Sequence, residues 1–124
     1  EQYSSGTAIA RQAKDLGLKV ESAKDVFNLA VSGDGTACRI LESAGRYLGI
    51  AVSGLVNVLN PDAIVLGGGV AASWDFLNEP VRREIASRCY EATARHVNIC
   101  RAALGEDAGI LGAARTAFCS AKSG

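Results

Sequence analysis

The sequence predicts an α/β fold that is rich in helix and contains one short parallel βαβ unit. Apolar residues recur at steps of three and four between residues 37 and 59, which is the spacing of a helix with one buried face. Two short apolar segments, 63–66 and 97–102, are instead bounded by turn residues, as strands are. The composition is 48% hydrophobic and 21% charged, and we expect residues 1–124 to form a single globular domain.

Two helices are predicted in the first part of the chain. Residues 7–16 are rich in Ala and end at Gly17, a residue that commonly terminates helices. Ser22 and Asp25 have the spacing of a capping box, with Asp in place of Glu, and they precede a short helix that ends near Gly33.

Asp34 is placed to cap a much longer helix that ends at Asn60 and Pro61. Its apolar stripe is expected to face the core and consists of Ala37, Ile40, Leu41, Ala44, Leu48, Ala51, Val52, Leu55 and Leu59. Each glycine in a helix lowers its stability by roughly 1 kcal/mol relative to Ala. Gly45, Gly49 and Gly54 are therefore expected to permit close packing against a neighbouring element.

The segments 63–66 and 97–102 are predicted to be parallel strands, the first of them buried on both faces. Between them, Ser73 is expected to cap one helical piece and Pro80 to begin a second that runs to Cys89. Two strands are few for an α/β sheet, so we expect further strands to precede residue 1.

Past the second strand, Asp107 is expected to start a closing helix over residues 108–117, followed by a frayed tail. Glu106 and Asp107 are interpreted as helix-capping residues. Arg82 and Arg83 are interpreted as a solvated helix face, and His96 is given no role.

Charge and cysteine content exclude several classes of protein. Thirteen basic and thirteen acidic residues balance, which disfavours nucleic-acid binding by this segment. Apolar runs are far shorter than the roughly 20 residues that cross a bilayer, and the amino end lacks a signal-peptide pattern. Four scattered cysteines without a CxxC pair predict buried thiols and no metal site: Cys38, Cys89, Cys100 and Cys119. We expect a cytoplasmic protein.

Gly67, Gly68 and Gly69 directly follow the first strand, at the sheet edge where open parallel sheets bind ligands. Glycines expose backbone N–H groups and tolerate positive φ, which suits a loop beside a nucleotide. Spacing alone favours a tight strand-to-helix turn over a ligand site, because neither GxGxxG nor a Walker lysine is present.

Most of the chain resembles the ROK family (repressors, open reading frames and kinases). The similar stretches are Leu48-Gly49, residues 57–70, residues 79–82, residues 103–105 and residues 107–114. The resemblance implies the carboxyl-terminal lobe segment of an actin-like, ribonuclease H-like ATPase fold, with Gly67, Gly68 and Gly69 beside adenosine. It also implies that Glu1 hydrogen-bonds sugar hydroxyls, since residues 1–6 are similar to the segment that follows the family's zinc cysteines.

Several elements of the family have no counterpart here: the amino-terminal phosphate-binding motif, the catalytic Asp and the zinc cluster. No catalytic or metal-binding residue is therefore assigned, and we expect this segment alone to be inactive. The implied parent protein phosphorylates a hexose or an N-acetylhexosamine with ATP and magnesium, as a glucokinase does.

Two alternatives remain open at this point. In the first alternative, the parent protein is a sugar-responsive transcriptional repressor, which binds sugar in the same cleft without needing ATP. The intact triple glycine favours the kinase over this alternative. A third hypothesis is an interaction module in which the stripe over residues 37–59 makes a homo-oligomer. Intramolecular packing of that stripe is the preferred interpretation.

Overall fold

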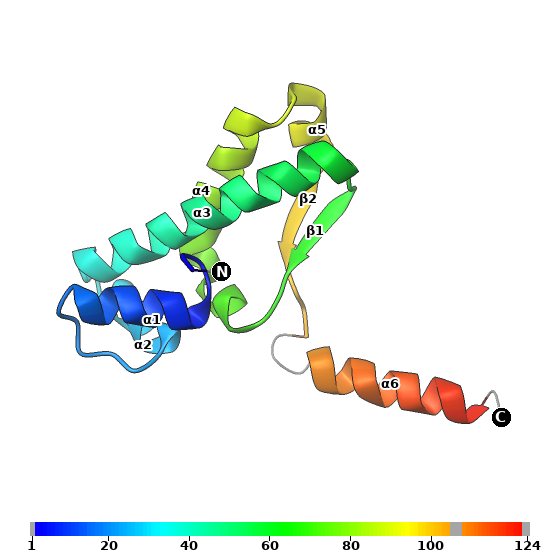
Figure 1. Cartoon of the computed structure of the whole chain (residues 1–124), viewed down its shortest axis with the longest axis horizontal. Coiled ribbons are helices and arrows are strands. Elements are labelled where there is room, and N and C mark those ends of the chain that lie inside the picture. Colours follow the sequence, from blue (N-terminus) through cyan, green and yellow to red (C-terminus); the bar gives the residue numbers. More distant parts are fainter. Residues whose placement is uncertain (1, 105–107, 123–124) are drawn as a thin grey trace.

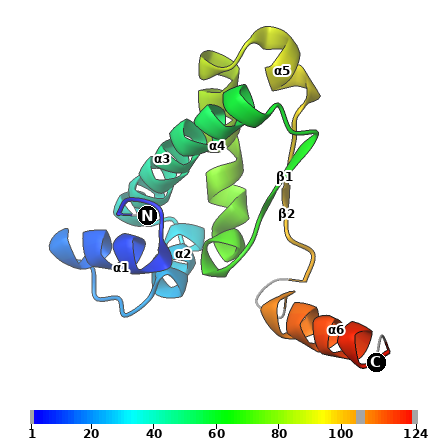
Figure 2. The ribbon, with the colours of Figure 1, turned by 45° about the vertical axis from the view of Figure 1, so that its right-hand side comes forward.

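The computed structural model describes residues 2–104 and 108–122, in which helices dominate and two short strands pair (Figure 1). The elements, in chain order, are α1 (Gly6–Asp15), α2 (Ala23–Val31), α3 (Gly35–Leu59), β1 (Ala63–Leu66), a 3-10 turn η1 (Gly69–Ser73), α4 (Trp74–Arg88), α5 (Glu91–His96), β2 (Asn98–Arg101) and α6 (Ala108–Lys122). The helices α3 and α4 lie side by side and form the axis of the molecule, with α1 and α2 at one end and the sheet along the other (Figures 1 and 2).

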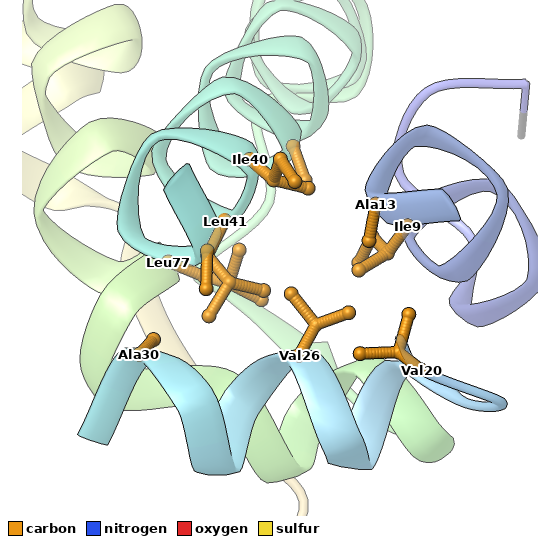
Figure 3. Packing of buried hydrophobic residues seen from close by; sticks show 10 residues of the cluster. Ile9, Ala13, Val20, Val26, Ala30, Ile40, Leu41 and Leu77 are labelled. Atoms are coloured by element: carbon orange, nitrogen blue, oxygen red, sulfur yellow. The ribbon is translucent and has the colours of Figure 1, made fainter. Parts of the chain in front are cut away.

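The end that contains α1 and α2 has its own apolar core. The predicted capping box is confirmed, because Ser22 Oγ accepts from the backbone N–H of Asp25 and the Asp25 carboxylate accepts from that of Ser22. Side chains from α1, α2 and the start of α3 meet over the buried Leu77 of α4 (Figure 3). The core comprises Ile9, Ala13, Val20, Val26, Ala30, Ala37, Ile40, Leu41, Ala44 and Leu77.

The long helix α3 begins and ends where the sequence predicts. Asp34 Oδ1 accepts from the backbone N–H groups of Thr36 and Ala37 at 2.9 and 2.8 Å, which satisfies two donors of the first turn. Asn60 ends the helix in the left-handed conformation, with φ 44°, immediately before Pro61.

Two of the three predicted close-packing glycines lie against α4. A Cβ on Gly45 would lie 3.0 Å from the Cβ of Pro80, and a Cβ on Gly49 would lie 3.0 Å from the Cα of Val81. The prediction is wrong for Gly54, where a Cβ would have no atom within 4 Å. Gly54 lies on the exposed side of the helix, which spacing along one helix does not reveal.

The apolar stripe of α3 is only partly core. Its first half is buried as predicted. In the second half, the side chains of Ala51, Leu55 and Leu59 are exposed. Val52, which belongs to the predicted stripe, and Val56, which does not, are the residues buried against α4 and β2 in the second half of the helix. A helix that is apolar on two faces gives no sequence signal for which face is covered.

The two strands pair in parallel, as predicted, with Ala63 opposite Asn98 and Leu66 opposite Arg101. The connection between them passes through η1, α4 and α5 and completes the βαβ unit. The prediction that the first strand is buried on both faces is wrong for the described part of the chain, since Val65 is 61% exposed. Ile64 and Leu66 alternate with it and contact the helices, so one face of the strand is covered.

The helix α4 is continuous from Trp74 to Arg88, whereas the sequence predicted two joined pieces. Pro80 lies inside it, buried and packed against Gly45, so the helix accommodates the hydrogen bond that proline removes. The predicted cap at Ser73 is also wrong, because its side chain is buried and makes no cap hydrogen bond.

Two side-chain contacts fix the sheet to its surroundings. Arg82 Nη2 donates to the carbonyl of Ile99 at 2.9 Å, so Arg82 anchors β2 to α4 and is more than a solvated side chain. His96 Nε2 and Asp62 Oδ1 lie 2.7 Å apart, which joins the residues just before the two strands. Cys38, Cys89 and Cys100 are half-buried, and their thiols donate to backbone carbonyls.

The last helix, α6, extends to Lys122, beyond the predicted end at residue 117, and it lies apart from the α3–α4 body (Figures 1 and 2). Its apolar side chains Ile110 and Phe118 are exposed. The predicted caps Glu106 and Asp107 fall outside the described residues. Among the helices of residues 2–104 and 108–122, none combines the length and the hydropathy of a membrane span.

Candidate functional site

An open cleft of about 910 Å³ lies between α1, α2 and the loop that follows β1. The three elements meet at the end of the molecule where both parallel strands terminate (Figure 2). Ligands of open α/β sheets bind at this carboxyl edge. The cleft therefore lies at the carboxyl edge of the two parallel strands.

The glycine loop contributes bare backbone to the cleft. Gly68 has φ 74°, a conformation that residues with a Cβ rarely adopt, and Gly69 begins η1. A Cβ built on either glycine would have no atom within 4 Å, so the space beside this backbone is open to the cleft. A bound molecule can approach the main chain there without meeting a side chain.

Charged side chains of both signs line the cleft, with more basic than acidic residues. The charged lining residues of the described chain are Arg11, Lys14, Lys24, Arg101, Asp15 and Glu21. Lys14 Nζ pairs with Glu21 Oε2 at 3.1 Å. Phe27 supplies aromatic surface, and its ring is held edge-on by Phe76 at a centroid distance of 5.7 Å. An aromatic surface beside an excess of positive charge suits a ligand with a planar ring and an anionic group.

Asp25 fixes the turn that forms one rim of the cleft. Its Oδ2 accepts from the backbone N–H of Glu21 and of Ser22, both at 2.9 Å, and from Ser22 Oγ at 3.0 Å. These hydrogen bonds, that from Glu21 first, hold the pKa of the Asp25 carboxyl below its ordinary value. The ionised carboxylate thus keeps Glu21 and Ser22, which line the cleft, in place.

The predicted site residues are distributed as follows. Gly68 and Gly69 line the cleft. Gly67 lies beside the residue that follows β2, since a Cβ on it would lie 3.6 Å from the Cβ of Ala102. Glu1 lies outside the described residues, although the segment that follows it leads directly into α1.

Sequence reasoning missed the helical walls of the cleft. Thr7, Arg11 and Lys14 recur at steps of four and three, which marks one polar face of α1. That periodicity predicts a polar face on α1. It does not predict that Gly68 and Gly69, which come much later in the chain, line the same cleft as this face. Arg101 was likewise counted only as a strand residue.

Comparisons with known proteins agree with one another. The ROK family model matches residues 1–118. A glucokinase of Halalkalibacterium halodurans is 38% identical over 93 residues, which make up 75% of this chain and 28% of that protein. The xylose repressor of Bacillus subtilis is 30% identical over 112 residues, 90% of this chain and 29% of that protein.

Solved structures give the same result. The structure of a ROK family glucokinase from Streptomyces griseus in complex with glucose and AMPPNP has a TM-score of 0.78 and 26% identity, over 94% of this chain and 43% of that one. The fold is the actin-like ATPase fold of such sugar kinases, here helix-rich with a small parallel sheet. The chain spans less than a third of the length of the two curated relatives and less than half of the solved structure.

Proposed function

The chain belongs to the ROK family, and from that premise we propose that residues 1–124 are the carboxyl-terminal portion of an ATP-dependent sugar kinase of the glucokinase type. In this role the chain forms one wall of the nucleotide site and contributes a sugar ligand. The rest of the parent protein supplies the catalytic base and the remaining phosphate-binding groups, so the segment alone is inactive.

The open backbone of Gly68 and Gly69 within a basic cleft carries this proposal. The arrangement suits ATP, since backbone that carries no Cβ admits the adenosine moiety closely while Arg11, Lys24 and Arg101 provide positive charge. The similar Streptomyces griseus glucokinase is described in complex with AMPPNP and glucose, which supports the same two ligand classes here. Gly67 completes the loop, beside Ala102.

Each group of this chain has a separate part in the proposed reaction. The Gly68–Gly69 backbone and the basic lining position the nucleotide, and positioning together with charge stabilisation accounts for most of phosphoryl-transfer catalysis. Magnesium, when bound with ATP, supplies neutralisation of phosphate charge. Glu1 is proposed to accept hydrogen bonds from a pair of adjacent sugar hydroxyls, for which an ionised carboxylate is a strong acceptor.

A repressor is the second candidate function, because the xylose repressor of Bacillus subtilis is 30% identical over most of this chain. A repressor of this type would bind sugar through Glu1 and would have no requirement for ATP in the glycine cleft.

A coupled assay of ADP release distinguishes the candidates. The complete parent protein is expected to release ADP only when ATP-magnesium and a hexose or N-acetylhexosamine are both present, whereas purified residues 1–124 release none above a contaminant control. Sugar binding by the parent without any ADP release would support the repressor instead. Sugar-dependent turnover by residues 1–124 alone would show that the active site has been misplaced.

A further inference from the structure

We propose that the ring of Phe27 in α2 is the surface on which the base of the nucleotide lies, and that Phe76 in α4 positions this ring. The inference rests on the proposed function, in which ATP occupies the cleft between α1, α2 and the loop after β1. It assigns one wall of the cleft to the base and leaves the basic lining residues for the phosphates.

One face of α2 is turned toward the cleft. Its described lining residues are Ala23, Lys24, Phe27 and Asn28. Steps of one and four place these residues on one side of a helix. Phe27 is the one aromatic residue among the described residues that line the cleft. Val26 and Ala30 of the same helix are buried in the apolar core, which fixes the position of α2 beside the cleft.

The Phe27 ring is held by the core and by Phe76. It is half-buried and packs against the apolar core that includes Leu77. The Phe27 and Phe76 rings have centroids 5.7 Å apart and planes inclined by 86°, an arrangement that aromatic pairs prefer. The turn η1 leads from the glycine loop into α4, so Phe76 belongs to the segment that continues this loop. The ring pair therefore joins α2 to the side of the cleft that Gly68 and Gly69 form.

Small residues leave room beside the Phe27 ring. The described lining residues without bulky side chains include Gly68, Gly69 and Ala72 on the loop and η1, and Ala23 on α2. The elements α2 and η1 contact each other, so they bound the same part of the cleft. Because there is open space where a Cβ of Gly68 or Gly69 would lie, a flat ring can enter beside Phe27 without meeting a side chain of the loop.

The phenyl ring and the charged residues favour different parts of a nucleotide. A base is flat and uncharged, and stacking on an aromatic side chain raises affinity by roughly tenfold or more. A triphosphate gains nothing from a phenyl ring and binds instead to basic groups. Arg11, Lys24 and Arg101 supply such groups in this cleft. The base is therefore the part of ATP that accounts for an aromatic residue in this wall.

Titration calorimetry of the complete parent protein with AMPPNP and with glucose tests this inference. Phe27→Leu keeps an apolar side chain but removes the flat ring, and it is expected to weaken AMPPNP binding about tenfold and glucose binding less than twofold. Phe27→Tyr restores a flat ring and should bind AMPPNP within about threefold of wild type. Phe76→Leu removes the support of the ring and should weaken AMPPNP binding about threefold. Val31→Ala, at a side chain of α2 that is 64% exposed and does not line the cleft, is the matched control and should change neither.

A competitor without a base separates contact with the base from a structural defect. Ribose 5-triphosphate keeps the sugar and the phosphates, and its affinity is measured by displacement of AMPPNP. This affinity should differ by less than about twofold between wild type and Phe27→Leu. Equal losses of affinity for AMPPNP and for ribose 5-triphosphate would overturn the role of Phe27, because a general defect of the cleft affects both ligands.

A measurement on the wild type does not depend on how well the variants fold. Nuclear Overhauser effects are expected between the adenine ring protons of bound AMPPNP and the ring protons of Phe27, and their absence would overturn the inference. If the wild-type parent binds AMPPNP and a folded Phe27→Leu protein binds it equally well, the base lies elsewhere and the proposed function stands. If the wild-type parent binds glucose but no AMPPNP, the proposed nucleotide site fails and the inference fails with it.

Discussion

Gly49 of α3 and Val81 of α4 lie so close that a methyl group on the glycine would sit 3.0 Å from the Cα of Val81. It would also sit 2.8 Å from the Cβ of Glu84. Contacts of this length to backbone and Cβ atoms cannot be relieved by rotation of a flexible side chain. The separation of the two long helices is therefore set by the absence of a side chain at this position.

Gly49→Ala is expected to destabilise the protein by about 1–3 kcal/mol, because the added methyl group overpacks the α3–α4 interface. This range is the net loss, after subtraction of the roughly 1 kcal/mol that alanine gains over glycine in helix propensity. Urea unfolding followed by circular dichroism measures the change.

Gly54→Ala is the matched control on the same helix, since a Cβ there would have no atom within 4 Å. It is expected to raise the free energy of unfolding by up to about 1 kcal/mol. Equal effects of the two substitutions would contradict the described helix contact.

Asp25→Asn is expected to destabilise the α2 start, because the amide replaces the carboxylate that accepts three hydrogen bonds from Glu21 and Ser22. Hydrogen bonds lower the pKa of Asp25 in the folded state, so its contribution is present above the ordinary value of about 3.9 and is lost as the pH falls through the lower folded value. The stability difference between variant and wild type should therefore be largest near pH 7 and shrink as the pH falls. Urea titrations at pH 7, 4 and 3 measure it.

The pKa of Glu84 is also lowered in the folded state, so the wild-type protein has a second acid-sensitive carboxylate. Its pKa is lowered first by the hydrogen bond from Arg88, with Nε to Oε2 at 2.6 Å, and then by Arg46. Wild-type stability is thus expected to be level above about pH 5 and to decline below about pH 4. A stability that rises on acidification through this range would contradict both carboxylate assignments.

Arg82→Met is expected to loosen β2, because the guanidinium of Arg82 links Asn78 of α4 to the carbonyl of Ile99. The expected loss is about 1 kcal/mol, the usual size of such a hydrogen bond. Amide hydrogen exchange of residues 98–101 should quicken accordingly. Arg83→Met removes only an exposed ion pair with Glu42 and should leave that exchange unchanged.

The local elements of this fold were predictable where one residue fixes one feature. Asp34 and Asn60 bound α3, and the Ser22–Asp25 box starts α2, because capping depends on neighbours in the chain. The strand β1 matched its predicted bounds, since proline and glycine bracket a short apolar run.

Features that depend on contacts between distant segments were not predictable. Pro80 lies inside α4 and packs against Gly45, a contact that no local rule predicts. The exposed side of α3 and the helical walls of the cleft also depend on contacts between distant segments, so the sequence did not predict them. Only Gly68 and Gly69 were identified in the cleft from the sequence, whereas Arg11 and Phe27 needed the tertiary structure to bring them there.

Gly69→Val in the complete parent protein is expected to raise the Michaelis constant for ATP at least tenfold and that for sugar less than twofold, because the side chain enters open space in the cleft that we propose to bind the nucleotide. Gly68→Val should have the same effect on ATP and also cost stability, on the order of 1–2 kcal/mol, since its φ of 74° is strained for a residue with a Cβ. Gly54→Val adds the same bulk on the exposed side of α3 and should leave both constants unchanged. If ATP kinetics were normal in a Gly69→Val protein that circular dichroism shows to be folded, the glycines would serve only as a turn, and the repressor function would gain support.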